Sequence, residues 1–187
     1  MLAFDPAPDD AHPSQASHAP PTLDAFLASI ERRAFRFAEL SLADREDALD
    51  AVQDAMIKLT AYAGRPAGEW TPLFWRILRT RIVDVQRRRM FRLRWLAPAP
   101  ADGGQTLDWA DDAPDPSRRH DSREAFSRLH DALRALPTRQ REAFTLRVLE
   151  ELDVADTARA MGCSEGAVKT HLSRARDALQ RQLEDVR

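Results

Sequence analysis

Apolar residues recur at helical spacing along most of this chain, and no stretch has the strict alternation of apolar and polar positions that is typical of a β-strand. The first such stretch runs from Thr22 to about Leu40, and threonine is a residue type that caps helix N-termini. We therefore predict a first helix here, with an apolar stripe of Leu23, Phe26, Leu27, Ile30 and Phe37.

Two further helices are expected before residue 97. The apolar positions of the first are Leu49, Val52, Met56 and Leu59. The sequence GRPAGEWTP, residues 64–72, has two glycines and two prolines and is expected to interrupt the helical pattern. The next helix is predicted to begin near Pro72 and to end near Trp95, with Leu73, Ile77 and Val83 among its apolar residues.

The helical pattern resumes at about Asp121, and Pro137 then marks the start of another helix. The stripe before Pro137 consists of Phe126, Leu129, Leu133 and Leu136. These patterns predict an all-α fold.

The segment VADTARAMGCSEGAVKTHLSRARDAL, residues 154–179, is typical of a helix-turn-helix. Ala158 is small enough for two helices to approach, Gly162 can adopt a left-handed turn, and Ser164 can cap the second helix. The inner stripe of that second helix would be Val168, Leu172, Ala175 and Leu179.

Proline and aspartate divide the chain into two small helical domains joined by a flexible linker. Residues 1–21 contain five prolines and little to bury, so we predict a disordered N-terminal tail. Residues 97–117 contain four prolines and five aspartates but no Lys or Arg, the composition of an extended linker, which we place at 97–120. The expected domains are therefore residues 22–96 and 121–187.

The net charge of −2 conceals a segregation of charge along the chain. Five acidic residues from Asp44 to Asp54 are accompanied by Arg45 alone, whereas eight arginines from Arg76 to Arg94 are accompanied by Asp84 alone. Arginines interleaved with aromatic residues indicate contact with nucleic acid, and a solvated helix face is the alternative.

Several classes of protein are excluded or disfavoured by composition. No apolar run approaches the roughly 20 residues that a membrane-spanning helix needs, so no membrane insertion is expected. The N-terminus lacks the positive charge and apolar core of a signal peptide, which predicts a cytoplasmic location. Cys163 is the only cysteine, and it and the histidines lack zinc-site spacing. We expect no metal, no cofactor and no catalytic site.

The predicted outer face of the second helix of the helix-turn-helix combines cations and hydroxyls that suit DNA. Arginine can form two bonds with guanine, lysine neutralises phosphate, and hydroxyls can pair with several base edges. The residues on this face are Lys169, Thr170, Ser173, Arg174 and Arg176. An ordinary helical hairpin with a solvated face is the competing interpretation.

The C-terminal segment LPTRQREAFTLRVLEELDVADTARAMGCSEGAVKTHLSRARDAL resembles region 4 of the sigma-70 family of RNA polymerase sigma factors, which binds the promoter −35 element. REDALDAVQDAMIKL resembles region 2.2, and FWRILRTRIVDVQRRR resembles regions 2.3 and 2.4, which open and recognise the −10 element. The short linker without an intervening domain resembles the extracytoplasmic-function (ECF) subgroup. The resemblance covers nearly everything after residue 22.

This resemblance implies three sets of functional residues. For the −35 element they are Glu165, Lys169, Thr170, Ser173, Arg174 and Arg176. For the −10 element and melting they are Trp75, Arg76, Arg79, Thr80, Arg87, Arg88 and Arg89, with the loop Gly64 to Trp70 completing a pocket for flipped bases. For binding to the polymerase they are Asp47, Asp50, Gln53 and Asp54. For Trp70 and Trp75, a place in the hydrophobic core is an equal alternative to base stacking.

The partners implied are core RNA polymerase, through its clamp coiled-coil and its flap, promoter DNA and an anti-sigma factor. The chain would then be a transcription initiation factor and not an enzyme. A LuxR-type helix-turn-helix regulator is the alternative, because VKTHLSR resembles that family equally well, but residues 22–96 lack the strands of a receiver domain. A hydrolase or nuclease and a helical protein-binding adaptor are further alternatives.

Overall fold

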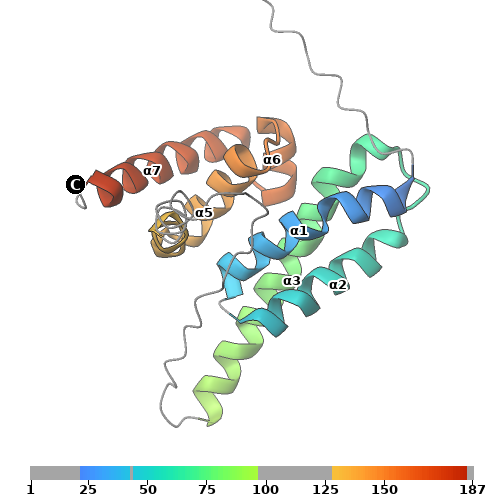
Figure 1. Cartoon of the computed structure of the whole chain (residues 1–187), viewed down its shortest axis with the longest axis horizontal. Helices are drawn as coiled ribbons and strands as arrows, with labels where there is room; N and C mark the ends of the chain where they lie inside the picture. The colour runs from blue at the N-terminus through green and yellow to red at the C-terminus, as the bar shows by residue number, and fades with distance from the viewer. Residues whose placement is uncertain (1–21, 43, 97–127, 185–187) are drawn as a thin grey trace, which may run out of the picture.

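The structure is a computed structural model that describes residues 22–42, 44–96 and 128–184. Within these ranges every regular element is a helix, which confirms the predicted all-α class. The first group consists of α1 (Leu23–Leu42), α2 (Arg45–Thr60) and α3 (Ala67–Leu96), which pack together as a bundle (Figure 1). The C-terminal part of α3 extends away from this bundle.

The second group follows residue 127. It begins with helical residues 128–135 and continues through α5 (Thr138–Phe144), the π-helical η1 (Thr145–Leu149), α6 (Val154–Met161) and α7 (Glu165–Glu184). Pro137 is the N-cap residue of α5, which confirms the predicted helix start at this proline.

Side-chain caps define where the first two helices begin. The Ala25 N–H donates to Thr22 Oγ1 at 3.2 Å, as the sequence predicts for α1. The N–H groups of Glu46 and Asp47 donate to Asp44 Oδ1 at 3.0 and 3.1 Å at the start of α2. Each cap satisfies N–H groups that have no partner within the helix.

The expected interruption over residues 64–72 is only partly correct. α3 begins at Ala67, so Pro72 lies inside the helix near its start. Because the first four N–H groups of a helix have no internal acceptor, a proline this close to the N-terminus removes only the bond to the carbonyl of Gly68. The loop between α2 and α3 is correspondingly shorter than predicted.

Alanines form much of the contact surface of α2, which corrects the predicted stripe. Leu49 is 41% exposed, whereas Ala48, Ala51 and Ala55 are almost fully buried. Small residues let α2 approach α1 and α3 closely, so their positions, and not those of the leucines, mark its inner face. Val52 and Leu59 are buried as expected.

The helix-turn-helix has the predicted construction. Gly162 follows α6 with φ 63° and ψ 45°, the left-handed conformation, and its N–H donates to the Ala158 carbonyl. The Ala167 N–H donates to Ser164 Oγ at 3.2 Å, which caps α7. Val168, Ala175 and Leu179 are buried, and Leu172 is half-buried.

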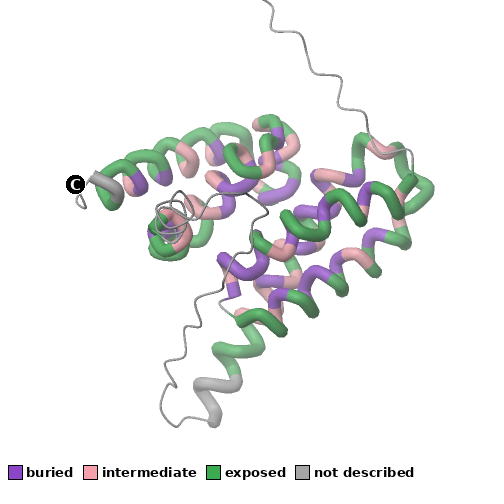
Figure 2. The backbone as a smooth tube through the Cα atoms, viewed as in Figure 1, coloured by how far each residue is buried: buried purple, intermediate pink, exposed green. Residues whose placement is uncertain are grey.

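The two groups of helices also pack against each other, mainly through α3 and α6. Buried positions continue from one group to the other in Figure 2. Leu40 of α1, for example, is buried against Leu133, Leu136 and Leu179 of the second group. The predicted tail 1–21, the whole predicted linker 97–120 and Phe126 lie outside the described residues.

None of the helices in the described ranges has the length and apolar character that crossing a bilayer would require.

Candidate nucleic-acid and polymerase interfaces

The solvent-facing side of α7 carries the residues predicted to contact the −35 element. Every member of this set is exposed: Glu165, Lys169, Thr170, Ser173, Arg174 and Arg176. The Thr170 hydroxyl donates to the carbonyl of Gly166 at 2.9 Å, so its oxygen lone pairs remain available as acceptors. The structure therefore brings all six side chains to one accessible helix, with two arginines and a lysine among them.

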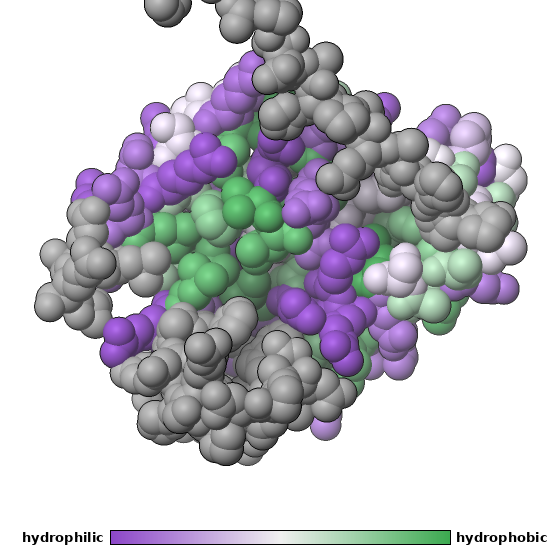
Figure 3. Space-filling model, turned by 45° about the horizontal axis from the view of Figure 1, so that its top comes forward, coloured by the Kyte–Doolittle hydropathy of each residue, from purple (hydrophilic) through white to green (hydrophobic). Residues whose placement is uncertain are grey.

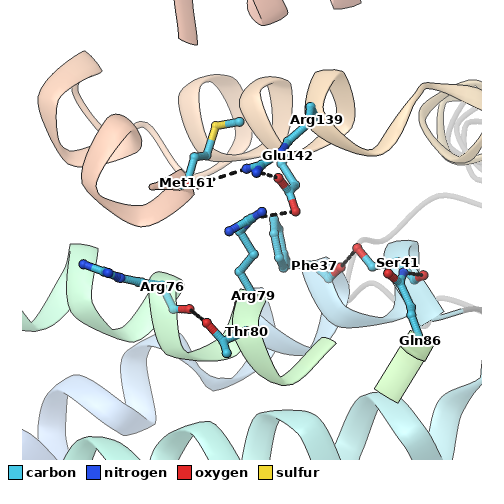
Figure 4. A network of polar contacts seen from close by, with 9 residues as sticks. All are labelled: Phe37, Ser41, Arg76, Arg79, Thr80, Gln86, Arg139, Glu142 and Met161. Carbon is cyan, nitrogen blue, oxygen red and sulfur yellow. Dashed lines mark hydrogen bonds and ion pairs between the residues drawn. The ribbon is translucent and has the colours of Figure 1, made fainter. Parts of the chain in front are cut away.

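Hydrogen bonds order α6, the helix that packs against α7. Asp153 caps α6 by accepting from the N–H of Asp156 at 2.6 Å, and its carbonyl accepts from the hydroxyl of the fully buried Thr157 at 2.7 Å. Arg139 of α5 donates from Nη1 to the carbonyl of Met161 at 2.9 Å, at the end of α6 (Figure 4). These bonds fix α6 and its end, next to the turn that leads into α7.

The predicted −10 residues lie along α3 but do not form one uniform surface. Arg76, Thr80, Arg87 and Arg88 are exposed. The Thr80 hydroxyl donates to the Arg76 carbonyl at 2.9 Å. These four residues could reach a nucleic acid without rearrangement of the protein.

Two of the α3 arginines bond to other helices, Arg79 at a largely buried site and Arg89 from an exposed position. The Nε of Arg79 donates to Glu142 Oε1 at 2.8 Å, and the two side chains are only 17% and 5% exposed. Arg89 donates from Nη1 to the Leu42 carbonyl at 3.4 Å, at the end of α1. The neighbouring Gln86 donates to the Ser41 carbonyl at 2.9 Å. Both arginines therefore have structural partners that the sequence did not indicate.

Trp75, for which the sequence left base stacking and a place in the core as equal alternatives, lies in the core. Trp75 is 1% exposed and lies edge-on to Phe37 and Phe74, at centroid distances of 5.3 and 5.6 Å. Trp70 is also buried, next to Phe26. Both rings therefore fill the core of the first group, which is the alternative to base stacking that the sequence left open.

The predicted polymerase-binding face lies on α2. Asp50, Gln53 and Asp54 are exposed, and Asp47 is half-buried. Leu49 and Ile57 of the same helix are 41% and 68% exposed. A mixture of apolar and acidic side chains on one helix is suited to a protein partner.

Polar and apolar side chains also meet elsewhere on the surface. On the face of the molecule drawn in Figure 3, an apolar area is bordered by hydrophilic residues.

Between the two groups lies an open cleft of about 500 Å³, lined by Arg76, Ala155, Ala158, Arg159, Gly162, Cys163 and Glu165. Arg76 and Glu165, predicted to read different promoter elements, thus share one cleft. Within the described residues, no cluster of potential metal ligands occurs.

Sequence reasoning missed the charged residues that join the two groups. Arg33 of α1 lies 3.4 Å from Glu150 Oε2, and Glu39 of α1 is buried beside His130 and Arg134. Burial raises the pKa of Glu39 and of Glu150 above the ordinary value, and nearby cations only partly oppose this effect. Their partners are distant in sequence, so no local pattern could have identified them.

Comparison with known proteins identifies the family. A family profile described as Sigma-70, region 4, matches residues 126–179. The ECF RNA polymerase sigma factor SigM of Mycobacterium tuberculosis is 32% identical over 160 residues, covering 86% of this chain and 76% of SigM. This chain belongs to the ECF sigma factors. The ECF sigma factor BldN of Streptomyces coelicolor is 36% identical over 124 residues, which cover 66% of this chain but only 44% of BldN.

Solved structures agree with this ECF sigma factor assignment. The sigma factor RpoE of Bartonella quintana, crystallised with the anti-sigma factor NepR, is 28% identical, with a TM-score of 0.60 over 87% of this chain and 98% of RpoE. CnrH, in complex with the cytosolic domain of CnrY, shares the fold at 19% identity and a TM-score of 0.55, covering 89% of this chain and 92% of CnrH. The family assignment disfavours the LuxR-type alternative, and this ECF sigma factor is a regulatory transcription initiation factor.

Proposed function

We propose that this ECF sigma factor binds core RNA polymerase and directs it to promoters, with α7 reading the −35 element and α3 contributing to −10 recognition and melting. The observation that carries the proposal is the exposed face of α7, which a capped helix-turn-helix presents with its Lys169 and Arg174 side chains in solvent. Residues 22–96 would be region 2 and residues 121–187 region 4, joined by the linker 97–120.

At the −35 element, α7 would enter the major groove as the second helix of a helix-turn-helix does. Arg174 and Arg176 can pair with guanine or phosphate, and Lys169 can neutralise a phosphate. Glu165, at the start of α7, can accept a bond from cytosine, a base that presents an amino donor in the groove. These contacts would be spread over the length of the helix.

At the −10 element, Arg76, Arg87 and Arg88 would neutralise the backbone of the open strand, and the Thr80 hydroxyl would bond with a base or a phosphate. Because Trp75 and Trp70 are buried in the core, base stacking by either ring is not part of the proposal. Their role would be to hold α3 in place against α1, so that the arginines are presented on a rigid helix.

The polymerase would bind both groups of helices. On α2, the exposed Asp50, Gln53 and Asp54 would dock on the clamp coiled-coil, with the exposed Ile57 adding apolar contact. Region 4 would bind the flap. The protein would act in the cytoplasm as a regulator without a catalytic site of its own, and an anti-sigma factor is a proposed further partner because the similar RpoE of B. quintana was crystallised with one.

Reconstitution with purified core polymerase tests this function. We expect the chain to co-elute with core polymerase and to support run-off transcription from a subset of promoter fragments. The variant Asp50→Arg should weaken binding to core polymerase, whereas Glu31→Arg, the same reversal of charge at an exposed site on α1, should not. Failure of the unmodified chain to bind core polymerase, together with specific DNA binding alone, would overturn the proposal in favour of a conventional DNA-binding regulator.

A further inference from the structure

The C-terminal part of α3 presents an exposed aromatic ring beyond the bundle. Phe91 is 65% exposed, and the preceding Met90 is 68% exposed. This part of α3 extends away from α1 and α2, and the residues before its end are drawn as exposed in Figure 2. Large apolar side chains in water, on a part of the helix that is not used for packing, are candidate contacts for a partner.

Phe91 lies on the same face of α3 as residues that are proposed to contact the −10 element. Successive residues of an α-helix are rotated by about 100°, so positions 76, 80, 87 and 91 fall within about 60° of one another. Arg76, Thr80 and Arg87 are exposed, as is Phe91. The fully buried Leu78 lies on the opposite side of the helix. Phe91 therefore continues the solvent-facing stripe and not the core-facing one.

The charges near Phe91 indicate the kind of partner that this stripe would bind. Arg87 and Arg88 are exposed within one turn before Phe91. Asp84 is the only acidic residue from Arg76 to Arg94 in the sequence. Such a surface is complementary to a polyanion. Single-stranded DNA fits it best, because the strand carries phosphates for the arginines and flat bases that stack on an aromatic ring.

The burial of the tryptophans leaves base stacking on α3 to a different ring. Trp70 and Trp75 are 6% and 1% exposed and lie against Phe26 and Phe37 of α1. Among the aromatic side chains of α3 that the structure describes, only that of Phe91 is exposed. Stacking without rearrangement of the core is therefore open to Phe91 and closed to both tryptophans.

The length of helix between Thr80 and Phe91 makes them separate contacts. Phe91 follows Thr80 by 11 positions, which is about 16 Å at about 1.5 Å per residue. That distance corresponds to about five nucleotides of a stacked strand at about 3.4 Å each. The two side chains cannot bind the same base, so Phe91 would add a contact at one end of the segment that α3 binds.

We propose that Phe91 is a base-stacking residue of this ECF sigma factor, whose ring stacks on an unpaired base of the opened promoter strand while Arg87 and Arg88 neutralise adjoining phosphates. The proposal rests on the function proposed above and adds a residue outside the set that the sequence indicated. Every base has a flat aromatic face, so the contact would add affinity with little sequence preference. In duplex DNA both faces of a base are covered by its neighbours, so the contact favours the open strand.

Two single-stranded oligonucleotides separate stacking from charge in the full chain. Both have about 20 nucleotides, longer than a typical binding groove for single strands. One has a mixed sequence, and the other consists of abasic residues, which keep the phosphates without bases. Phe91→Ala should weaken binding to the first strand by about 5- to 150-fold, the range for one stacked base, and leave binding to the abasic strand unchanged. Arg87→Ala should weaken binding to both strands, as fluorescence anisotropy at one fixed salt concentration would show.

Met90→Ala is the matched control, because Met90 is as exposed as Phe91 but is rotated by about 100° around the helix. It should leave both affinities unchanged. Phe91→Tyr keeps an aromatic ring and should retain binding to the base-containing strand, whereas Phe91→Leu keeps apolar bulk without the ring and should lose it. All of these positions are exposed, so circular dichroism should show that each variant folds as the unmodified chain does.

The same measurements on the free chain and on its complex with core polymerase separate this proposal from the proposed function. Phe91→Ala should bind core polymerase as tightly as the unmodified chain does. Failure of the unmodified chain to bind polymerase would contradict the proposed function, whereas a selective loss on the base-containing strand by the free chain would still support stacking by Phe91.

Three outcomes would overturn the proposal. The first is equal binding of the base-containing strand by the unmodified chain and Phe91→Ala, both free and with polymerase. The second is an equal loss on the two strands, or a loss of polymerase affinity in place of DNA affinity, which would assign the ring to a contact with the backbone or with a protein. The third is the absence of binding to either strand by the unmodified chain, alone and with polymerase.

Discussion

At the scale of single residues, the turn of the helix-turn-helix depends on the backbone conformation of Gly162. Its φ of 63° is in the left-handed region, and a Cβ placed there would meet no atom within 4 Å. A side chain at this position would therefore be strained only by the backbone conformation, and not by a clash with neighbouring atoms. The sequence identified this glycine because α6 must stop and reverse within a few residues of α7.

Replacing Gly162 by alanine should lower the free energy of unfolding by about 1 kcal/mol, since an L-residue in the left-handed conformation is strained by about that amount. Urea titration followed by circular dichroism would measure the change. Gly68→Ala is the matched control, because Gly68 lies in α3 with open space around its Cβ position and no positive φ. It should be neutral or stabilising by up to about 1 kcal/mol. Equal effects at the two glycines would contradict the backbone explanation.

Trp75 shows why residue type alone does not assign a role. A tryptophan beside an arginine-rich helix can stack on a base or fill the core, and the two uses leave the same local pattern. Its contact with Phe37 of α1 decides the question, because that contact joins residues 38 positions apart in the sequence. Only the packing of α1 against α3 makes the core role visible.

Trp75→Ala should destabilise the protein by about 3–5 kcal/mol, the range for removal of a large buried aromatic side chain. Arg76→Ala, at the adjacent exposed position, should change the free energy of unfolding by no more than about 0.5 kcal/mol. Chemical denaturation of both variants provides the comparison. A small effect of Trp75→Ala on stability would show that the ring is not part of the core and would reopen the stacking role.

At the scale of elements, α7 combines a buried stripe with a solvent face in the arrangement predicted from spacing. Val168 and Ala175 are fully buried, whereas Lys169 and Arg174 are exposed. This helix could be predicted because its pattern is local, with a cap, a turn and a period of 3.6 residues within 26 positions.

The double variant Lys169→Ala with Arg174→Ala should weaken binding of the polymerase holoenzyme to a −35-containing promoter fragment. The slope of the logarithm of the binding constant against the logarithm of salt concentration should become shallower by up to about 1.8, or about 0.9 for each phosphate that is no longer neutralised. Arg181→Ala, an exposed change in the last turn of the same helix, serves as the control and should leave the slope nearly unchanged. An unchanged slope in the double variant would exclude binding of phosphates by these two residues.

The helices that were predicted less accurately are those whose inner faces are built from small residues or that contain a proline near their start. In α2, the buried Ala48, Ala51 and Ala55 carry no strong hydrophobic signal, so the larger but exposed Leu49 was assigned to the core. In α3, the glycine and prolines before Leu73 predict a loop, but a helix tolerates a proline near its start. Both errors arise because propensity is weak compared with tertiary contacts.

At the scale of the whole molecule, buried carboxylates make the packed arrangement sensitive to pH. Burial raises the pKa of Glu39, and the cations opposing this shift come from Arg45 of α2 and from His130 and Arg134 of the second group. A carboxyl group whose pKa is raised in the folded protein binds more protons there than in the unfolded chain. Its contribution to stability is therefore fully present below the ordinary pKa of 4.5 and is lost as the pH rises through the raised value.

Glu39→Gln should accordingly raise the free energy of unfolding at pH 7, because glutamine keeps the size of the side chain without its charge. The gain should shrink as the pH falls toward 4.5, where the carboxyl of the unmodified protein is increasingly protonated in both states. Thermal or urea unfolding across this pH range would measure the difference, with Glu31→Gln, at an exposed site on α1, as the control. A gain that does not depend on pH would indicate a packing effect and not a titration.

Local patterns in the sequence determined the helices, the capped turn at Gly162 and the cationic face of α7, because caps, left-handed turns and helical periodicity involve residues within a few positions of one another. The tertiary structure alone decided that Trp75 belongs to the core and that Glu142 holds Arg79. Those outcomes depend on the burial of groups that are brought together from distant parts of the chain, and burial changes both the energy of a charge and the surface that a side chain can offer.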